Sequence, residues 1–251
     1  MNRRCVLIGV EGNHDQAFLQ RIFCKLLGFS KWDENPETLD HIWNKFIPQY
    51  PTKKRKYYAR LDMPSILHKE DVAIAIYVGE GSNLIQNLRD KLSDIDPDSF
   101  AAFAIIADAD KNSPDEIAKI YQDGLKEYFP YFPIELGTTV KGSTNLGIYI
   151  LPNNSDKGVL DTLLCKCGEM AYPIHMARAK TYINQFSDEE IKHWKPFDRQ
   201  KAIVAAITSI LKPGKTSTVS ISDGKWISND TAERIPEISA LLDFLTDLID
   251  L

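Results

Sequence analysis

Apolar residues are grouped in short blocks along the chain, and four of these blocks have the length and composition of buried strands. The blocks lie at residues 6–10, 72–78, 100–107 and 147–151, and a segment with apolar residues at helical spacing follows each of them. Strands that alternate with helices in this way predict an α/β fold. We expect a mostly parallel central sheet with helices on both faces.

Capping signals place the ends of two of these helices. Asn13 with Gln16 three residues later has the spacing of a capping box, and Gly28 is a natural stop for the same helix. Ser113, the proline that follows it and Glu116 predict the start of a second helix, which runs to about residue 126. These signals agree with the alternation of strands and helices.

Two stretches interrupt the alternation. Residues 30–70 form an insertion between the first helix and the second strand. After residue 168 the pattern becomes mainly helical, and it closes with an amphipathic segment at 235–251. We therefore predict an α/β domain over residues 1–168, with the insertion at about 30–70, and a small helical C-terminal extension over 169–251 that packs on it.

Acidic residues follow two of the predicted strands. Glu11 ends the first strand, and Asp108 and Asp110 end the third. Ligands of open α/β sheets bind at the carboxyl ends of the strands, and side chains at i and i+2 of an extended chain share a face. Two carboxylates that close repel one another unless a cation lies between them or one keeps its proton. The pair indicates either a divalent-cation site or a solvated loop acid beside a helix-capping acid.

Glycines accompany these acids. Gly12 follows Glu11, and the second strand runs into a turn that contains Gly79, Gly81 and Ser82. Backbone N–H groups in such a turn, placed before a helix, can bind a phosphate. The alternative is an ordinary tight turn without a ligand.

A basic segment lies inside the predicted insertion. It contains Lys53, Lys54, Arg55, Lys56, Tyr57 and Arg60. Cations neutralise phosphates and aromatic rings stack on exposed bases, so the segment favours contact with nucleic acid. The alternative is a solvated loop.

The overall composition limits the possible partners. The 251 residues carry a net charge of −5, so contact with nucleic acid requires a local basic patch such as this one. The apolar run near the N-terminus is too short for a signal peptide and no segment is long enough to cross a membrane, which predicts a cytoplasmic protein without membrane contact. The C-x-C pair at 165–167 has no second ligand pair, so zinc is disfavoured.

Two stretches together resemble the TOPRIM domain of topoisomerases, primases and OLD-family nucleases. They are "VLIGVEG", a predicted strand that ends in Glu-Gly, and the later "AIIADAD", a predicted strand that ends in Asp-x-Asp. The segment "GIYILPNNSDKGVLDTLL" is similar to one in stand-alone TOPRIM-like proteins, which has a Gly-x-Leu-acid motif. The resemblance implies that Asp108 and Asp110 hold Mg²⁺, and that Glu11 is a general acid/base or a further ligand. It also makes Asp161 a ligand, although this acid is often Glu in the relatives.

From this resemblance we expect a Mg²⁺-dependent protein, with Mn²⁺ as a second possible metal, that acts on the phosphodiester bonds of nucleic acid as a nuclease. The alternative is a non-catalytic module of the same fold that binds nucleic acid or nucleotides. A HAD-type phosphatase is disfavoured, because Lys111 and Asn112 follow the Asp-x-Asp pair and the pair lies on the third strand.

Beside Glu11, His14 is either a phosphate contact or an exposed first-turn residue, and Asp15 is a favourable charge at a helix N-terminus.

Overall fold

A computed structural model describes residues 3–47 and 63–251 of the chain. Its strands form a seven-stranded sheet in the order β2-β3-β4-β1-β5-β7-β6. The strands are β1 (Arg4–Val10), β2 (Ser30–Lys31), β3 (Ser65–Lys69), β4 (Val72–Val78), β5 (Ala102–Asp108), β6 (Thr139–Val140) and β7 (Asn145–Leu151). The α-helices are α1 (Asn13–Lys25), α2 (Leu84–Leu92), α3 (Pro114–Leu125), α4 (Leu160–Ala171), α5 (Pro173–Ile183), α6 (Asp198–Leu211), α7 (Ser217–Asp223), α8 (Asn229–Arg234) and α9 (Pro236–Ile249).

The α/β class is confirmed, and the prediction of a mostly parallel sheet holds only in part, because the sheet is mixed. The central strands β4, β1, β5 and β7 pair in parallel. At the edges, β3 pairs antiparallel with β4, β2 with β3, and β6 with β7. Both β2 and β3 come from residues 30–70, so part of the predicted insertion extends the sheet.

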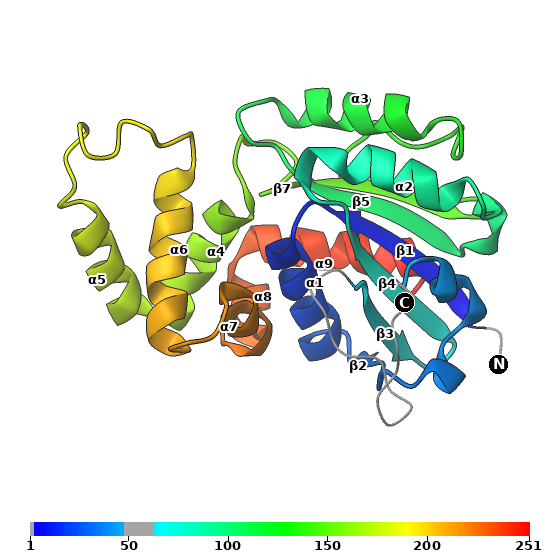
Figure 1. Cartoon of the computed structure of the whole chain (residues 1–251), viewed down its shortest axis with the longest axis horizontal. Helices are drawn as coiled ribbons and strands as arrows, with labels where there is room; N and C mark the ends of the chain where they lie inside the picture. Colours follow the sequence, from blue (N-terminus) through cyan, green and yellow to red (C-terminus); the bar gives the residue numbers. More distant parts are fainter. Residues whose placement is uncertain (1–2, 48–62) are drawn as a thin grey trace.

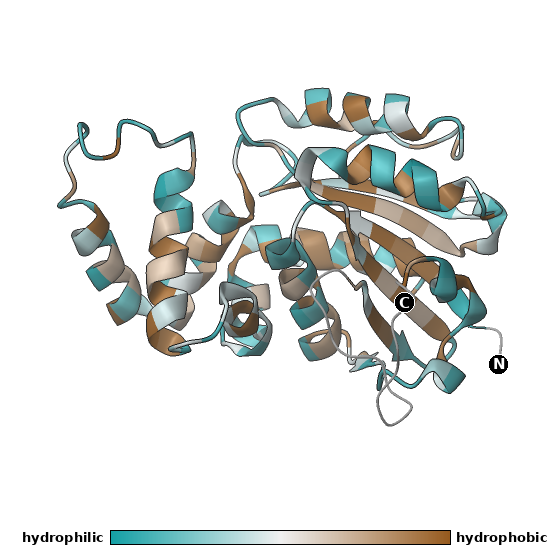
Figure 2. Ribbon diagram, viewed as in Figure 1, coloured by the Kyte–Doolittle hydropathy of each residue, from teal (hydrophilic) through white to brown (hydrophobic). Residues whose placement is uncertain are grey.

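Helices cover both faces of the sheet. In Figure 1, α2 and α3 lie over one face, whereas α1 and α9 lie under the other. Each face has its own hydrophobic cluster, and Leu7 belongs to one of them while its neighbours Val6 and Ile8 belong to the other. This is the alternation expected of a strand that is buried on both sides. Figure 2 shows the result as continuous hydrophobic colour along the central strands and alternating colour along the covering helices.

The hydrophobic core continues across residue 168, where we predicted the start of the C-terminal extension. Phe244 of α9 packs on β7, with its ring centroid 5.4 Å from that of Tyr149. A Cβ atom on Gly147 would lie 2.7 Å from the Phe244 ring, so this close approach requires glycine. The chain ends also meet, since the Arg4 guanidinium donates to the carbonyl of Ile249 at 3.2 Å.

The predicted capping residues are confirmed at the start of α3 and are wrong at the start of α1. Ser113 caps α3 and forms the predicted box with Glu116. At α1 the N-cap is Gly12 instead of Asn13, and the Asp15 carboxylate accepts the N–H of Gly12 at 2.8 Å. Gln16 is buried and donates to the carbonyl of Ile76 at 3.0 Å, so it ties the helix to β4.

None of the helices in the described part of the chain is long and apolar enough to cross a membrane.

Candidate functional site

Acidic side chains gather at the carboxyl ends of the parallel strands. Glu11 follows β1, Asp108 ends β5, and Asp15 and Asp161 lie in the first turns of α1 and α4. These acids act on one another: the charges of Glu11 and Asp161 raise the pKa of Asp15, and those of Asp15 and Glu11 raise the pKa of Asp108. The structure thus brings together Glu11, Asp108 and Asp161 from the predicted site and adds Asp15. We call Glu11, Asp15, Asp108 and Asp161 the acidic cluster.

Hydrogen bonds fix three carboxylates of the acidic cluster. Oδ1 of Asp108 accepts from the backbone N–H of Leu160 at 2.8 Å, at the first turn of α4. Oδ2 of Asp15 accepts from the N–H of Gly12 at 2.8 Å, at the start of α1. Charged acceptors are favourable at helix N-termini, so both helices help to hold the cluster in place. Glu11 is held differently, because its Oε1 accepts from the hydroxyl of Tyr121 at 3.1 Å.

Burial is the main reason why these carboxyl groups hold protons more tightly than in water. Asp15 is 7% exposed, and burial together with the charge of Glu11 raises its pKa to about 7. Burial also raises the pKa of Asp108 well above its usual range. The pKa values of Glu11 and Asp161 are raised by burial too, although Lys201 of α6 opposes both shifts. Burial therefore opposes the ionisation of all four carboxyl groups, and Lys201 offsets this only in part at Glu11 and Asp161.

Asp110 does not share an extended strand face with Asp108, and this part of the prediction is wrong. The strand β5 ends at Asp108, and Asp110 has a left-handed backbone with φ of 50°. Its N–H donates to the carbonyl of Gly158 at 2.7 Å, and the N–H of Gly158 donates back at 3.1 Å. The exposed side chain still raises the pKa values of Glu11 and Asp108, so Asp110 lies at the rim of the acidic cluster.

The glycines of the predicted phosphate site are used within the chain. The N–H of Gly79 donates to the carbonyl of Val10 at 2.9 Å, and that of Gly81 to the carbonyl of Glu11 at 2.8 Å. The N–H of Gly12 is engaged by Asp15. Gly79 also has a packing reason, because a Cβ atom there would overlap the backbone of Leu84. Phosphate binding at Gly12, Gly79, Gly81 and exposed Ser82 stays a prediction.

Three residues near the acidic cluster were not predicted as functional. The signal for Asp15 was its position three residues after the N-cap Gly12, a spacing that we assigned to Asn13 and Gln16 instead. Tyr121 lies 110 residues from Glu11, and Lys201 lies in the predicted C-terminal extension, so no local pattern links either of them to the site. The predicted nucleic-acid contacts Lys53, Lys54, Arg55, Lys56, Tyr57 and Arg60 lie outside the described residues.

The donor chemistry of the acidic cluster suits Mg²⁺, which prefers oxygen ligands. Asn13 adds a further oxygen at the start of α1, since its buried Oδ1 has no hydrogen-bond partner. In the described part of the chain, however, no three His, Cys, Asp or Glu side chains are arranged so as to hold a metal ion. A cation at this edge would therefore require side-chain rotation in the cluster.

The C-x-C pair is poorly suited to metal or redox chemistry. Burial raises the pKa values of Cys165 and Cys167 to about 12, so both thiols stay protonated near neutral pH. Thiols, unlike thiolates, are weak ligands and weak nucleophiles. The pair lies on α4 with Cys167 fully buried, as expected of small core residues.

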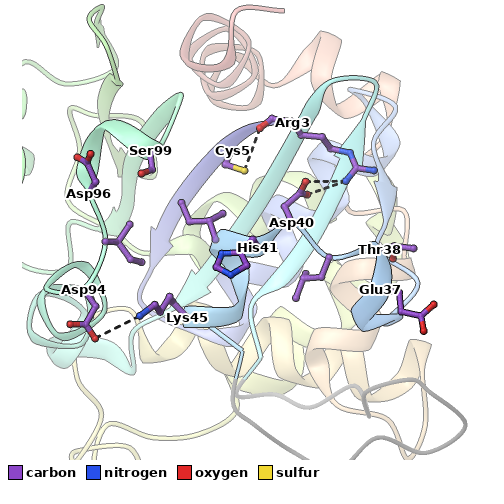
Figure 3. Close-up of a pocket in the computed structure, with 13 residues that line it drawn as sticks. Arg3, Cys5, Glu37, Thr38, Asp40, His41, Lys45, Asp94, Asp96 and Ser99 are labelled. Carbon is purple, nitrogen blue, oxygen red and sulfur yellow. Dashed lines mark hydrogen bonds and ion pairs between the residues drawn. The ribbon is translucent and has the colours of Figure 1, made fainter. Parts of the chain in front are cut away.

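A cavity of about 860 Å³ lies at the other end of the strands (Figure 3). Residues before or at the start of β1 line it together with the segments 37–45 and 94–99, and none of the predicted site residues does so. Two ion pairs belong to it: Arg3 with Asp40 at 3.1 Å, and Lys45 with Asp94 at 4.0 Å. These pairs engage Asp40 and Asp94, and the lining also contains the acids Glu37 and Asp96.

Comparison with known proteins gives a family and a fold. The model of the family described as "Protein of unknown function (DUF3226)" matches residues 6–250. A crystal structure of a hypothetical protein from Pyrococcus horikoshii OT3 is similar, with a TM-score of 0.62 and 18% sequence identity over 98% of this chain and 95% of that chain. At this identity the similarity shows the fold alone. No curated protein gives a significant match.

Proposed function

The chain belongs to the DUF3226 family, whose description assigns no activity, and we propose that it is a Mg²⁺-dependent nuclease that acts on phosphodiester bonds of nucleic acid. Mn²⁺ is the second metal that the same oxygen ligands would accept. The observation that carries the proposal is the acidic cluster, in which several buried carboxylates with raised pKa values meet at the carboxyl edge of the parallel strands.

Ionisation of the acidic cluster is energetically unfavourable in the folded chain. Burying carboxylates next to one another opposes their ionisation and so destabilises the fold at neutral pH. A divalent cation would remove this repulsion. In the proposal Glu11, Asp108 and Asp161 hold the ion, Asp110 contributes from the rim, and Asp15 adds negative charge behind them. Such an ion would stabilise the charge of a phosphodiester transition state.

The residues around the acidic cluster support a reaction on phosphates. Glu11 is the proposed proton-handling group, because its raised pKa places it closer to neutral pH than an ordinary glutamate. Lys201 lowers the pKa values of Glu11 and Asp161 and so brings positive charge to the same edge, where His14 also lies near Asp161. In the proposal they neutralise part of the charge of a bound phosphate group. The basic segment 53–60 is the proposed contact for the rest of the nucleic acid.

The TOPRIM resemblance supports the same proposal. Its two acidic motifs follow β1 and β5, and these strands are direct neighbours in the sheet. The Gly-x-Leu-acid motif lies at the start of α4, where Asp161 joins the acidic cluster and Leu160 binds Asp108. Motifs far apart in the sequence therefore meet in one place. Membership of the TOPRIM superfamily remains part of the proposal.

A specific observation favours the alternative of a non-catalytic binding module. Asp15, Asp108 and Glu11 each accept a hydrogen bond from within the protein. In the described residues no three ligating side chains are arranged around a metal position. An acidic cluster satisfied in this way can be structural, and the protein would then bind nucleic acid or nucleotides without cleaving them.

Cleavage assays separate the two functions. The purified protein is incubated with plasmid DNA, single-stranded DNA and RNA in Mg²⁺, in Mn²⁺ and in EDTA. The proposal predicts metal-dependent cleavage that EDTA abolishes and that Asp108→Asn greatly reduces. Asp40→Asn is the control, because Asp40 lies near the amino ends of the parallel strands, and this variant should cleave like the parent. Binding of these substrates without any cleavage would support the alternative, and cleavage that is equally fast in EDTA would contradict the metal.

A further inference from the structure

Three exposed lysines from separate segments lie around the carboxyl ends of the parallel strands. Lys111 belongs to the loop between β5 and α3, Lys157 to the loop between β7 and α4, and Lys201 to α6. The charge of Lys201 opposes the raised pKa values of Glu11 and Asp161, which places this lysine beside the acidic cluster. We call Lys111, Lys157 and Lys201 the lysine rim.

A backbone bridge holds two members of the lysine rim near one another. Asp110 and Gly158 pair in antiparallel fashion through N–H to carbonyl hydrogen bonds of 2.7 and 3.1 Å. Lys111 is the residue after Asp110. Lys157 is the residue before Gly158, and in an antiparallel pair these two positions lie on the same side of the bridge. The charge of Asp110 also raises the pKa of Glu11, so the bridge and its two lysines lie next to the acidic cluster.

The lysine rim is poorly neutralised within the protein. In the described part of the chain, neither Lys111 nor Lys157 forms an ion pair within 4.0 Å, although Lys157 lowers the pKa of Glu116 from a greater distance. Lys201 has one ion-pair partner, Asp198 on its own helix, at 4.0 Å. Like charges held near one another repel, and an anion bound between them would remove the repulsion. The lysine rim therefore favours an anionic ligand.

Lys201 connects the lysine rim to a basic segment of the chain. Residues 172–216, which include α5 and α6, contain eight Lys or Arg and four Asp or Glu, so this segment carries a net charge of +4. The rest of the chain carries −9. Figure 1 shows α5 and α6 beside the sheet, beyond α4. A polyanion at the carboxyl edge therefore meets positive charge on α6 as well as on the two loops.

We propose that the lysine rim binds the sugar–phosphate backbone of nucleic acid and holds it across the carboxyl ends of the parallel strands. The inference rests on the nucleic-acid partner of the proposed function, and it requires neither a metal ion nor cleavage. A chain with one charge per nucleotide can contact lysines on three elements at once, which a single phosphate cannot do. It can also continue along the basic segment 172–216.

Two other lysines offer a matched control. Lys25 lies in the last turn of α1 and Lys91 in the last turn of α2, and neither forms an ion pair within the described residues. The helix α1 starts at the carboxyl edge, and its 13 residues extend for about 20 Å. Its last turn is thus far from the lysine rim. The variant Lys25→Gln/Lys91→Gln removes the same net charge as Lys111→Gln/Lys157→Gln, but from another part of the surface.

The test measures binding of a fluorescent single-stranded oligonucleotide, as DNA and as RNA, by anisotropy over a series of salt concentrations. EDTA is present throughout, so that no metal-dependent cleavage occurs. Loss of one phosphate contact with a single strand lowers the slope of log K against log salt by about 0.7. The slope should therefore fall by about 1.4 in Lys111→Gln/Lys157→Gln, and by about 2.1 when Lys201→Gln is added. The control variant should keep the slope of the parent, and circular dichroism checks that all variants fold.

Each outcome decides a different point. A parent-like slope in Lys111→Gln/Lys157→Gln would overturn the inference and assign the contact to other cations, such as the segment 53–60. An equal fall in the control variant would also overturn it, because net charge alone would then explain binding. Polyglutamate that competes as well as an unlabelled oligonucleotide would overturn nucleic acid as the ligand.

The inference and the proposed nuclease can fail separately. Binding that depends on the lysine rim, in a protein that cleaves nothing in Mg²⁺ or Mn²⁺, would support the inference while the nuclease proposal fails. Metal-dependent cleavage by a protein whose salt slope does not depend on the lysine rim would have the reverse meaning. A parent that binds neither oligonucleotide would overturn the lysine rim and the nucleic-acid partner together.

Discussion

The two ends of the parallel strands both carry acids, but the protein compensates them in different ways. At the amino ends, Asp40 pairs with Arg3 at 3.1 Å and Asp94 with Lys45 at 4.0 Å, around the cavity of Figure 3. At the carboxyl ends, Asp15 and Asp108 accept bonds from neutral backbone N–H groups at the starts of α1 and α4. Cationic side chains pair with Asp40 and Asp94, whereas backbone dipoles hold Asp15 and Asp108.

This difference is the reason for placing the proposed chemistry at the carboxyl ends of the strands. Ion pairs neutralise charge locally and make little demand on a ligand. Backbone donors orient carboxylates but leave their net charge in place, and burial then raises their pKa values. The cavity of about 860 Å³ lies at the amino ends of the strands, whereas the proposed site lies at the carboxyl ends.

The most severe test of the carboxyl edge is the loss of the proposed proton-handling group. Glu11→Gln retains the shape and the acceptor oxygen but cannot take up a proton. In a protein that cleaves nucleic acid it should lower turnover by roughly 10²–10⁴-fold, the usual contribution of a positioned acid or base. Single-turnover cleavage rates measure the effect. Parent-like rates in the variant would remove Glu11 from the mechanism.

Metal affinity compares the two ends directly. Asp108→Asn should weaken Mg²⁺ or Mn²⁺ binding by at least the roughly 10–100-fold that loss of an outer-shell partner costs. The amide oxygen can still accept from Leu160, so α4 keeps its cap. Asp40→Asn should leave the affinity unchanged, because Asp40 lies at the compensated end. Calorimetry on the two variants gives the answer, and equal affinities would contradict the assignment of the site.

Stability should respond to pH through Asp15. Its carboxyl group has a pKa of about 7 in the folded chain, against an ordinary value of 3.8. Between these values the folded state holds more protons than the unfolded state, so the free energy of unfolding should fall as pH rises from about 4 to about 7. Asp15→Asn has no carboxyl group to ionise, so its free energy of unfolding should not fall in this way. At pH 8 it should exceed that of the parent by on the order of 1–2 kcal/mol.

Urea unfolding at pH 5 and pH 8, without metal, measures this change. The amide oxygen of the variant can still accept the N–H of Gly12, which keeps the helix cap comparable. Added Mg²⁺ at pH 8 should stabilise the parent if the cation binds the folded state. A pH dependence that is identical in parent and Asp15→Asn would show that Asp15 is not the group that titrates.

The smallest expected effect has the opposite sign. Asp40→Asn removes the charge that pairs with Arg3, so it should lower the free energy of unfolding by about 0.2–1 kcal/mol at neutral pH. High salt should reduce this difference because it screens the ion pair. The same urea experiment, with and without salt, provides the measurement. A stabilising effect of Asp40→Asn would mean that the two ends of the sheet are alike.

Signals confined to a few neighbouring residues were sufficient for much of the fold. Seven consecutive residues identified β4 (Val72–Val78), and the spacing of Ser113 and Glu116 located the start of α3. Such features follow from backbone sterics, side-chain period and capping bonds, which act over one or two turns. They also placed Glu11 and Asp108 at strand ends, because strand direction is fixed once strands alternate with helices.

The folded chain was needed for everything that depends on distant partners. The antiparallel edge strands β2 and β3 lie in what we predicted as an insertion, and the backbone turns away from the strand direction at Asp110. Tyr121 meets Glu11 only because the helix α3 packs beside α2 and over β7 in the folded chain. Burial, and not spacing, is the main cause of the raised pKa of Asp15. Solvent exclusion and contact across 110 residues depend on the order of the strands in the sheet, which no local pattern encodes.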